Sequence, residues 1–388
     1  MVRKSGSADL PLHGGHVPKL LAERMTRLGA VMTEAIVHHY GRDEFLRRLA
    51  HPFWFQSFGA VMGMDWHSSG ITTSVIGALK RGLAPLQNEL GIYVCGGRGK
   101  HSRQTPNELV SIGDRVGFDG SALANASRLV AKVDSAAVQD GYQLYHHVFF
   151  FTAAGDWCVV QQGMSDATRT ARRYHWLSDT VKSFVDEPHE AVCCDARAKT
   201  LNLVAHENNL VRRASVDLAA QRPSVTLDAL ATGGPKRRPA ALPLLEMPAR
   251  HTLVPEFDVA SPYLEKILLK TYERAPRDFE ALLGIEGVGP KTLRALALAS
   301  ELVHGTPATM RDPARFSFAH GGKDGTPFPV DKLTYDRTIE ILDKAINRSA
   351  IDRSEKVKAF RRLATFATAR NYPGAVPPPA TTRISPVM

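Results

Sequence analysis

Apolar residues in the first part of the chain recur every three or four positions, which is the spacing of an amphipathic helix. This spacing predicts helices over residues 20–32, 71–80 and 121–138, and another that begins near residue 107. Polar residues fill the intervening positions, so each helix would present one apolar face to a core. The N-terminal part of the chain is therefore expected to be rich in helix.

Short apolar runs bounded by glycine follow a different pattern and predict strands. Residues 91–97 are typical of a buried strand that ends in a glycine turn, and residues 142–152 and 156–162 predict a β-hairpin that turns near Gly155. Together, the helices and strands predict an N-terminal domain, residues 1–220, of the α+β or α/β class.

The hydrophobic pattern is interrupted by a basic segment rich in proline and glycine at residues 221–250. Such a composition is typical of a linker. Residues 251–370 carry helical spacing and predict an all-α C-terminal domain. The proline-rich residues 371–388 offer little to pack and predict a disordered tail.

The most distinctive pattern lies at residues 282–293, where one helical face ends, a glycine turn follows and a second helix begins. Gly287 and Gly289 bracket Val288 in a turn where a Cβ would block close approach of another backbone. The second helix starts at a proline, beside Lys291, and its first N–H groups can hold a phosphate. The pattern resembles the helix-hairpin-helix motif of DNA repair proteins, which grips phosphates without reading bases. The predicted DNA contacts are Gly287, Val288, Gly289, Lys291 and Thr292, and the alternative is a hairpin whose glycines only permit tight packing.

Composition agrees with a nucleic-acid partner. The 388 residues carry a formal net charge of +10 and a pI of about 9.5, which favours a polyanion through counterion release. The four cysteines have no CxxC spacing, so neither structural zinc nor a disulfide framework is expected. No apolar run approaches a membrane span and the N-terminus lacks the apolar core of a signal peptide, so we expect a cytoplasmic, nucleoid-associated protein.

Acidic and imidazole side chains cluster before one helix, at residues 65–67, and around the end of another, at residues 132–147. Two carboxylates and an imidazole suit Mg²⁺ or Mn²⁺, which can activate water for phosphodiester cleavage. The predicted metal ligands are Asp134, Asp140 and His146. The predicted catalytic residues are Asp65, His67, Lys132, Asp134, Asp140 and His146. The alternative is that these groups cap helices and form a polar network beneath the β-hairpin.

Two further segments combine cations with glycines or aromatic residues. Residues 96–103 form a glycine-rich basic turn suited to cradling phosphates, and residues 171–176 interleave cations with aromatic rings that can stack on an unpaired base. Their predicted DNA contacts are Arg98, Lys100, Arg103, Arg172 and Arg173. The alternatives are a solvated loop for the first segment and an exposed helix with one buried aromatic face for the second.

The hairpin also resembles that of the DNA glycosylase superfamily. In the lyase members of that family a lysine two residues after the last hairpin glycine attacks the sugar, and Lys291 matches this position. A later aspartate assists it, for which Asp312 and Asp331 are the candidates. Asp312 lies slightly too far along the chain and Asp331 much too far, so a phosphate-binding lysine and helix-capping aspartates are the favoured alternative.

Several segments together resemble a prokaryotic family named domain of unknown function 763. They are residues 7–15, 55–70, 132–145, 159–164 and 317–325. This resemblance implies an N-terminal α/β domain, a C-terminal hairpin domain and a role in DNA processing as a nuclease. It supplies no agreed set of catalytic residues.

The patterns together predict a metal-dependent deoxyribonuclease in DNA repair or processing. A hairpin that grips phosphates predicts selection by DNA structure, such as single strands or branches, and not by base sequence. The alternatives are a glycosylase or lyase centred on Lys291 and a non-catalytic DNA-binding protein. No membrane partner is expected, and a homodimer is left open.

Overall fold

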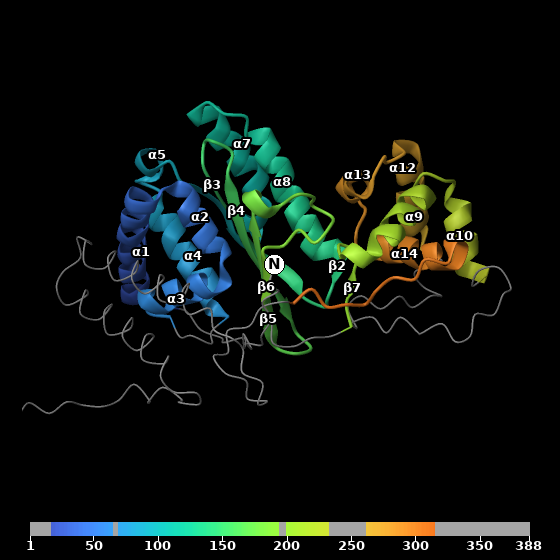
Figure 1. Ribbon diagram of the computed structural model, residues 1–388, viewed down its shortest axis with the longest axis horizontal. Coiled ribbons are helices and arrows are strands. Elements are labelled where there is room, and N and C mark those ends of the chain that lie inside the picture. The colour runs from blue at the N-terminus through green and yellow to red at the C-terminus, as the bar shows by residue number, and fades with distance from the viewer. Residues whose placement is uncertain (1–16, 65–68, 194–198, 233–260, 315–388) are drawn as a thin grey trace, which may run out of the picture.

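The computed structural model describes residues 17–64, 69–193, 199–232 and 261–314 (Figure 1). Some predicted features lie outside these residues. They are residues 1–16, Asp65, His67, most of the predicted linker, residues 251–260 and 315–370 of the predicted all-α domain, which include Asp331, and the predicted tail.

A five-stranded antiparallel sheet forms the middle layer of the fold. Its strands, in their order across the sheet, are β1 (Tyr93–Arg98), β3 (Gln143–Phe151), β4 (Trp157–Ser165), β5 (Thr170–Leu177) and β6 (Ala191–Cys193). The predicted hairpin is confirmed, because β3 and β4 pair from Phe151 opposite Trp157 onward. All four strand pairs are antiparallel, so the described part of the chain is an α+β fold and not a parallel α/β fold.

The first helices cover one face of this sheet. They are α1 (Lys19–Tyr40), α2 (Arg42–Ala50), α3 (Pro52–Met62), α4 (Gly70–Leu83) and the short α5 (Gln87–Leu90). Helices α1 and α4 confirm two predictions. They cross closely at Gly82, where an added Cβ would lie 2.5 Å from the Thr26 carbonyl oxygen. The apolar faces of these helices and of the sheet residues Val148, Phe150 and Val160 form one core.

The opposite face of the sheet is covered by α7 (Thr105–Val116) and α8 (Gly120–Lys132), which follow the short α6 (Lys100–Arg103). The predicted helix over 121–138 is wrong at its end: α8 stops at Lys132, residues Val133–Ala137 form a π-helical turn, and β2 (Val138–Gln139) follows. The wider π turn inserts residues into the helix, and such insertions often occur at functional sites. Strand β2 pairs with β7 (Leu201–Asn202) in a second, two-stranded sheet.

A group of helices extends this side of the molecule: α9 (Asn209–Ala219), α10 (Pro223–Thr232), α12 (Pro262–Arg274), α13 (Phe279–Gly284) and α14 (Pro290–His304). Two short 3₁₀ turns, Ser178–Thr180 and His206–Asn208, complete the described elements. Figure 1 shows the group beside β2, β7 and the end of α8.

The predicted linker begins with a helix. Residues 223–232 of that segment form α10, which packs against α12 and α14. One hydrophobic core contains Phe149 and Trp176 of the sheet together with Leu293 and Leu296 of α14. The predicted boundary at 221–250 therefore does not separate two cores, because the apolar faces of the later helices are buried against α8, α9 and the π turn.

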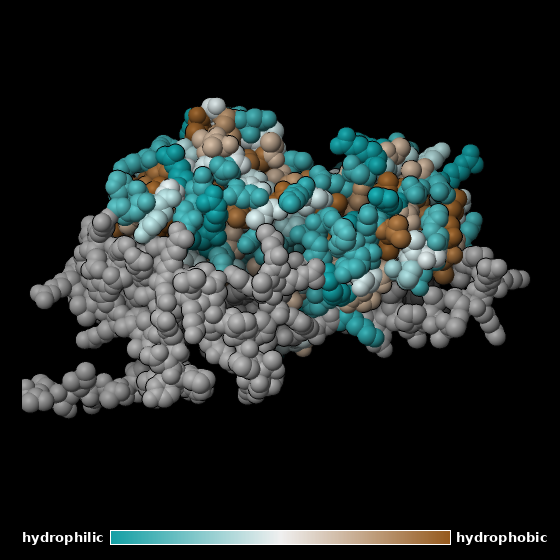
Figure 2. Space-filling model, viewed as in Figure 1, coloured by the Kyte–Doolittle hydropathy of each residue, from teal (hydrophilic) through white to brown (hydrophobic). Residues whose placement is uncertain are grey.

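Exposed large apolar side chains gather on the same helical group. Among the described residues they are Leu210, Val225, Tyr263, Leu269, Tyr272 and Val303, with Leu20 as the one example elsewhere. Figure 2 shows hydrophobic patches over this end of the molecule. No helix of the described ranges combines the length and the apolar character that a membrane crossing requires.

Candidate functional site

The register of the sheet sorts its polar side chains into two rows. Residues that pair directly across antiparallel strands project from the same face, and successive residues project from opposite faces. One row holds Arg98, His146, Gln162 and Arg173, and it faces α1–α4. The next row holds Gly97, His147, Gln161 and Tyr174, and it faces α8. Neighbouring residues of the sequence therefore belong to two different polar clusters.

Asp134 is the centre of the cluster on the α8 face. Its carboxylate accepts hydrogen bonds from Gln161 Nε2 and, at 2.9 Å, from Trp176 Nε1. His189 Nε2 lies 2.5 Å from the other oxygen. The π turn holds the Asp134 side chain at this position, completely buried. The side chain of His189 is 8% exposed, so this imidazole connects the buried Asp134 carboxylate to the surface.

His147 continues the same cluster. Its Nδ1 lies 2.7 Å from Gln161 Oε1, and its Nε2 lies 2.9 Å from Ser127 Oγ. Burial lowers the pKa of His147, which favours the neutral ring. An unbroken hydrogen-bonded chain thus runs from Ser127 through Asp134 to His189.

Asp140 belongs to a separate buried group. Its carboxylate accepts from Tyr174 Oη at 2.6 Å, from Arg172 Nη1 at 3.0 Å and from the Tyr142 backbone N–H at 3.0 Å. Arg172 also donates to Asp312 at 2.8 Å, and its guanidinium lies 4.6 Å from the centre of the Tyr142 ring. Donors from the protein itself therefore surround the Asp140 carboxylate. This arrangement agrees with the alternative of a polar network beneath the hairpin.

On the opposite face, Gln162 joins the sheet to the start of α4. Its Nε2 donates to the Ser69 carbonyl at 3.1 Å and to Tyr145 Oη, and its Oε1 accepts from Thr72 Oγ1. Arg173 completes the connection by donating to Gln56 Oε1 at 3.0 Å and to Thr72 Oγ1 at 3.3 Å.

Arg172 and Arg173 are both completely buried, which corrects their predicted role as surface contacts with DNA. The segment that carries them is a central strand and not an exposed helix. Alternation along β5 places each guanidinium in one of the two interior clusters. Both arginines therefore connect the sheet to the elements that cover it.

His146 differs from the other polar residues of its row. It is 3% exposed, yet within the described residues neither of its ring nitrogens has a hydrogen-bond partner. Burial, followed by the nearby His147 and Arg98, lowers its pKa to about 3. The ring is therefore neutral near pH 7, with one N–H donor and one acceptor nitrogen.

The structure does not assemble the predicted metal site. His146 lies on the face of the sheet opposite Asp134 and Asp140, because adjacent strand residues alternate and His147 occupies the Asp134 side. The two carboxylates are held by different donors, as described above. The described ranges contain no group of three or more His, Cys, Asp or Glu residues arranged to hold a metal ion.

The basic turn at residues 96–103 lies at one end of the His146 row. Gly96 has a φ of +91°, and an added Cβ would lie 2.3 Å from the His147 carbonyl oxygen. The Gly99 N–H donates to the Tyr145 carbonyl at 2.8 Å, which ties the turn to β3. Arg98, Lys100 and Arg103 are exposed, and none of them forms an ion pair with another described residue. The guanidinium of Arg98 lies 5.7 Å from the centre of the Tyr145 ring.

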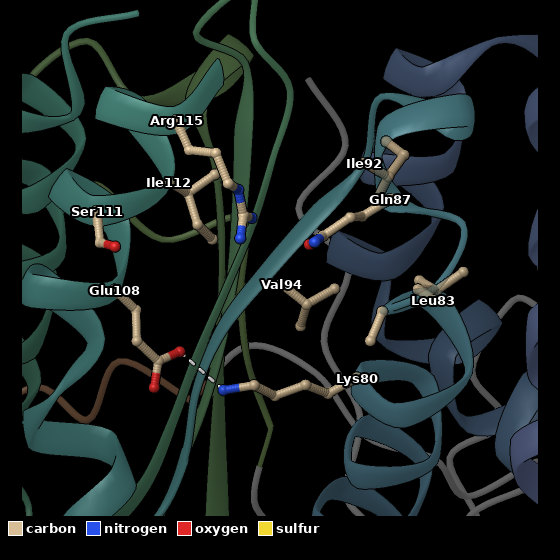
Figure 3. Close-up of a pocket in the computed structure, with 10 residues that line it drawn as sticks. Lys80, Leu83, Gln87, Ile92, Val94, Glu108, Ser111, Ile112 and Arg115 are labelled. Atoms are coloured by element: carbon tan, nitrogen blue, oxygen red, sulfur yellow. Dashed lines mark hydrogen bonds and ion pairs between the residues drawn. The ribbon is translucent and has the colours of Figure 1, made fainter. Parts of the chain in front are cut away.

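Beside the same turn, a pocket of about 330 Å³ opens between α4 and α7 at the edge strand β1 (Figure 3). Lys80 Nζ donates to the Gly96 carbonyl at 2.7 Å and pairs with Glu108 at 2.8 Å. Glu108 in turn accepts from the Gly96 N–H at 2.9 Å. This ion pair satisfies the backbone N–H and carbonyl of Gly96 on the edge strand β1, and the sequence pattern did not predict it.

At the predicted hairpin, residues 285–289 connect α13 to α14. Gly287 has a φ of +93°, and an added Cβ would lie 2.5 Å from Ile267 Cδ1. Val288 is completely buried, and its carbonyl accepts from Lys132 Nζ. Lys132, which was predicted to be catalytic, therefore supports the turn of the hairpin, and burial lowers its pKa.

Gly289 and Lys291 differ from the other predicted contacts of the hairpin. Gly289 precedes α14 in an extended conformation, and a Cβ there would meet nothing nearer than the Gly287 carbonyl oxygen at 3.9 Å. Lys291 is exposed, whereas Thr292 is 2% exposed and faces the core. The side chain of Thr292 is thus corrected from a DNA contact to a packing residue.

His189, Tyr145 and Thr72 were not in the predicted set. His189 follows a proline in a loop 55 residues after Asp134, so no spacing in the sequence connects the two. Thr72 lies near the start of α4, a few residues after the predicted catalytic residues at 65–67, and this was the one available signal.

The sheet, its two helical layers and its polar rows define an α+β protein with an attached group of helices that ends in a glycine-turn hairpin. The family model described as "Protein of unknown function (DUF763)" matches residues 6–330, and the chain belongs to this family. No curated protein and no solved structure matches the chain.

Proposed function

We propose that the protein binds DNA without reading its base sequence, by holding the sugar–phosphate backbone at the start of α14. The observation that carries this proposal is the surface at Gly289. The fold itself does not require a glycine there, since the backbone is extended and a Cβ would have open space. A glycine at this position instead leaves room for another chain to approach the helix start.

The chemistry of the helix start suits a phosphate. The first N–H groups of a helix have no partner within it and carry a partial positive charge, so they bind anions. Lys291 is exposed beside them. Phosphate contacts of this kind give affinity without sequence selection, and the formal net charge of +10 adds to it.

The test is the substitution Gly289→Asp. Aspartate is a favoured residue before a helix and its charge suits the helix N-terminus, so the variant should be at least as stable as the wild type. The same carboxylate would occupy and repel the place of the phosphate. Fluorescence anisotropy with a labelled single-stranded oligonucleotide at low salt should show binding weakened more than about tenfold, since like charges oppose association.

Val303→Asp is the matched control, because Val303 is exposed at the other end of α14 and the variant gains the same charge. It should bind DNA nearly as the wild type does. Equal losses in the two variants would mean that net charge alone drives binding, and undiminished binding by Gly289→Asp would exclude the helix start as the contact.

A second candidate function is cleavage of the bound strand, and the Asp134–His189 pair supports it. A buried carboxylate that is hydrogen-bonded to an imidazole fixes the orientation of the ring, as in a general acid–base pair. Cleavage of labelled single-stranded and bubble DNA, measured with Mg²⁺, Mn²⁺ or a chelator, should be lost in His189→Gln while binding is retained. Cleavage that survives His189→Gln, or none under any condition, would exclude this candidate.

The glycosylase alternative has less support. Asp312, the nearer of its two candidate aspartates, accepts from Arg172 at 2.8 Å and from the Ala314 N–H at 2.8 Å, and its side chain is 6% exposed. Asp331 lies outside the described residues. Borohydride trapping of a covalent adduct between Lys291 and abasic DNA would restore this alternative.

A further inference from the structure

We infer that the polar row at His146 is a second binding site, separate from the hairpin, and that its ligand is a phosphate group of a nucleotide or of a polynucleotide. The site consists of Arg98, Tyr145, His146 and Gln162, on the face of the sheet that α3 and α4 cover.

The unpartnered imidazole is the first observation. Buried polar atoms in folded proteins nearly always have a hydrogen-bond partner, and exceptions indicate a missing ligand or a functional group. Both ring nitrogens of His146 are such exceptions within the described residues, although the ring is 3% exposed. A ligand that contacts this ring would supply the missing hydrogen bond.

The neighbours of His146 are already fixed in place. Gln162 is held by Ser69, Thr72 and Tyr145, so its amide cannot turn toward the imidazole without losing these bonds. Tyr145 lies beside a bulge in the pairing of β3 with β4. The residues around the unpartnered His146 imidazole are therefore held in fixed positions. Such preorganisation is typical of a binding site.

Charge identifies the class of ligand. The row of four paired residues contains two arginines and no acid, which disfavours a cation. Arg98 is exposed at the β1 end of the row, and it has no ion pair with any described residue. An anion that reaches His146 from this end would be attracted by the guanidinium.

The basic turn extends this positive charge. Lys100 and Arg103 lie on α6, directly after Gly99, whose N–H holds the Tyr145 carbonyl. Gly96, Gly97 and Gly99 all have positive φ values, so the turn has a conformation that other residues rarely adopt. A glycine-rich turn with clustered cations next to an unused buried donor suits a phosphate, which accepts several hydrogen bonds at once.

The test measures binding of three probes to the full chain by isothermal titration calorimetry. The probes are inorganic phosphate, thymidine monophosphate and the dinucleotide dTpdT, each at constant ionic strength. Binding of phosphate or the monophosphate would support a free nucleotide as the ligand, and binding of dTpdT alone would support a polynucleotide backbone. Failure of all three to bind would overturn the inference.

Two variants locate the site. His146→Phe removes the polar atoms while keeping an aromatic ring, and it should fold at least as stably as the wild type without ligand, because no hydrogen bond of His146 is lost. Arg98→Glu changes an exposed residue, and Arg128→Glu on α8 is its control with the same charge change. Binding should fall more than tenfold in His146→Phe and Arg98→Glu and stay within twofold in Arg128→Glu. Full binding by His146→Phe would overturn the inference.

The outcome is distinguishable from that of the hairpin proposal. Gly289→Asp should retain binding of the three short probes while it loses binding of long DNA. If the hairpin proposal fails, the His146 variants still decide whether this site exists. Loss of the short probes in Gly289→Asp would mean that they bind at the hairpin, and the inference would be overturned.

Discussion

His146 and His147 are neighbours in the sequence but have opposite surroundings. His147 contacts Ser127 and Gln161, whereas His146 has no hydrogen-bond partner among the described residues. The pKa of His146 falls from an ordinary value of 6.5 to about 3. Between these two pKa values His146 is protonated in the unfolded chain but stays neutral in the folded protein. The free energy of unfolding must therefore fall as the pH decreases through this window.

We therefore predict that His146→Phe resists acid better than the wild type. At pH 7 both states hold a neutral His146, and this group contributes almost nothing to the pH dependence. At pH 5 the wild type should lose about 2 kcal/mol relative to the variant, since one pKa unit corresponds to about 1.4 kcal/mol. Urea unfolding at the two pH values measures this difference. If the stability difference between wild type and variant were the same at pH 5 as at pH 7, His146 would be protonated in the folded state at pH 5.

Gly287 provides a second prediction for a single residue. Gly287→Ala should lose about 1–3 kcal/mol of stability, because its φ is +93° and the new Cβ would lie 2.5 Å from Ile267 Cδ1. Gly284→Ala is the control, since a Cβ there meets nothing within 4 Å. It should be neutral or slightly stabilising in the same urea titration. Equal behaviour of the two variants would contradict the left-handed turn.

The residue types of the polar clusters could be predicted from the sequence, but their grouping could not. Asp134, Asp140 and His146 are all buried beside the sheet. Which face each one joins depends on the register of β3 and on a bulge between Leu144 and His146. No local pattern marks that bulge, so a sequence that suggested one metal site encodes separate clusters.

At the scale of elements, helices and strands with a regular hydrophobic periodicity were predicted correctly. The places where an element ends or interrupts this pattern were not. The helices α1, α4 and α7 and the hairpin of β3 and β4 have the predicted places. The π turn after α8 escaped prediction because Val133–Ala137 keeps an apolar spacing close to that of a helix. Helix α10 escaped because the proline and glycine run dominates the composition of the predicted linker, although it begins only after Thr232.

The edge strand β1 leads to a prediction at this scale. Unpaired edge strands can pair with another chain. Here Lys80 and Glu108, which form an ion pair beside β1 (Figure 3), occupy the backbone groups of Gly96. Glu108→Leu should lose at most about 1 kcal/mol of stability, since the pair is partly exposed. It should also self-associate as concentration rises, which analytical ultracentrifugation detects. Glu108→Gln keeps an oxygen that can accept from the Gly96 N–H, so it should stay as monomeric as the wild type. Self-association of both variants would contradict the protective role of Glu108.

At the scale of the whole molecule, contacts between segments far apart in the sequence connect the sheet to the later helices, across the proline- and glycine-rich segment at residues 221–250. Lys132 at the end of α8 holds the hairpin turn, and Gln139 donates to the Pro290 carbonyl at 2.9 Å. Arg172 connects the sheet to Asp312 beyond α14. Long-range pairing of this kind has no signature in local sequence, so the core shared by the sheet and α14 could not be predicted from it.

This shared core predicts that the sheet and the hairpin unfold together. Asp312→Ala should destabilise the whole molecule by about 3–5 kcal/mol, because it removes one partner from a buried ion pair with Arg172. Asp217→Ala, which removes an exposed carboxylate on α9, should stay within about 0.5 kcal/mol of the wild type. Tryptophan fluorescence reports the sheet through Trp157 and Trp176, and hydrogen exchange reports α14. Both signals should shift to the same lower urea midpoint in Asp312→Ala, whereas a shift confined to α14 would show that the hairpin helices form an independent unit.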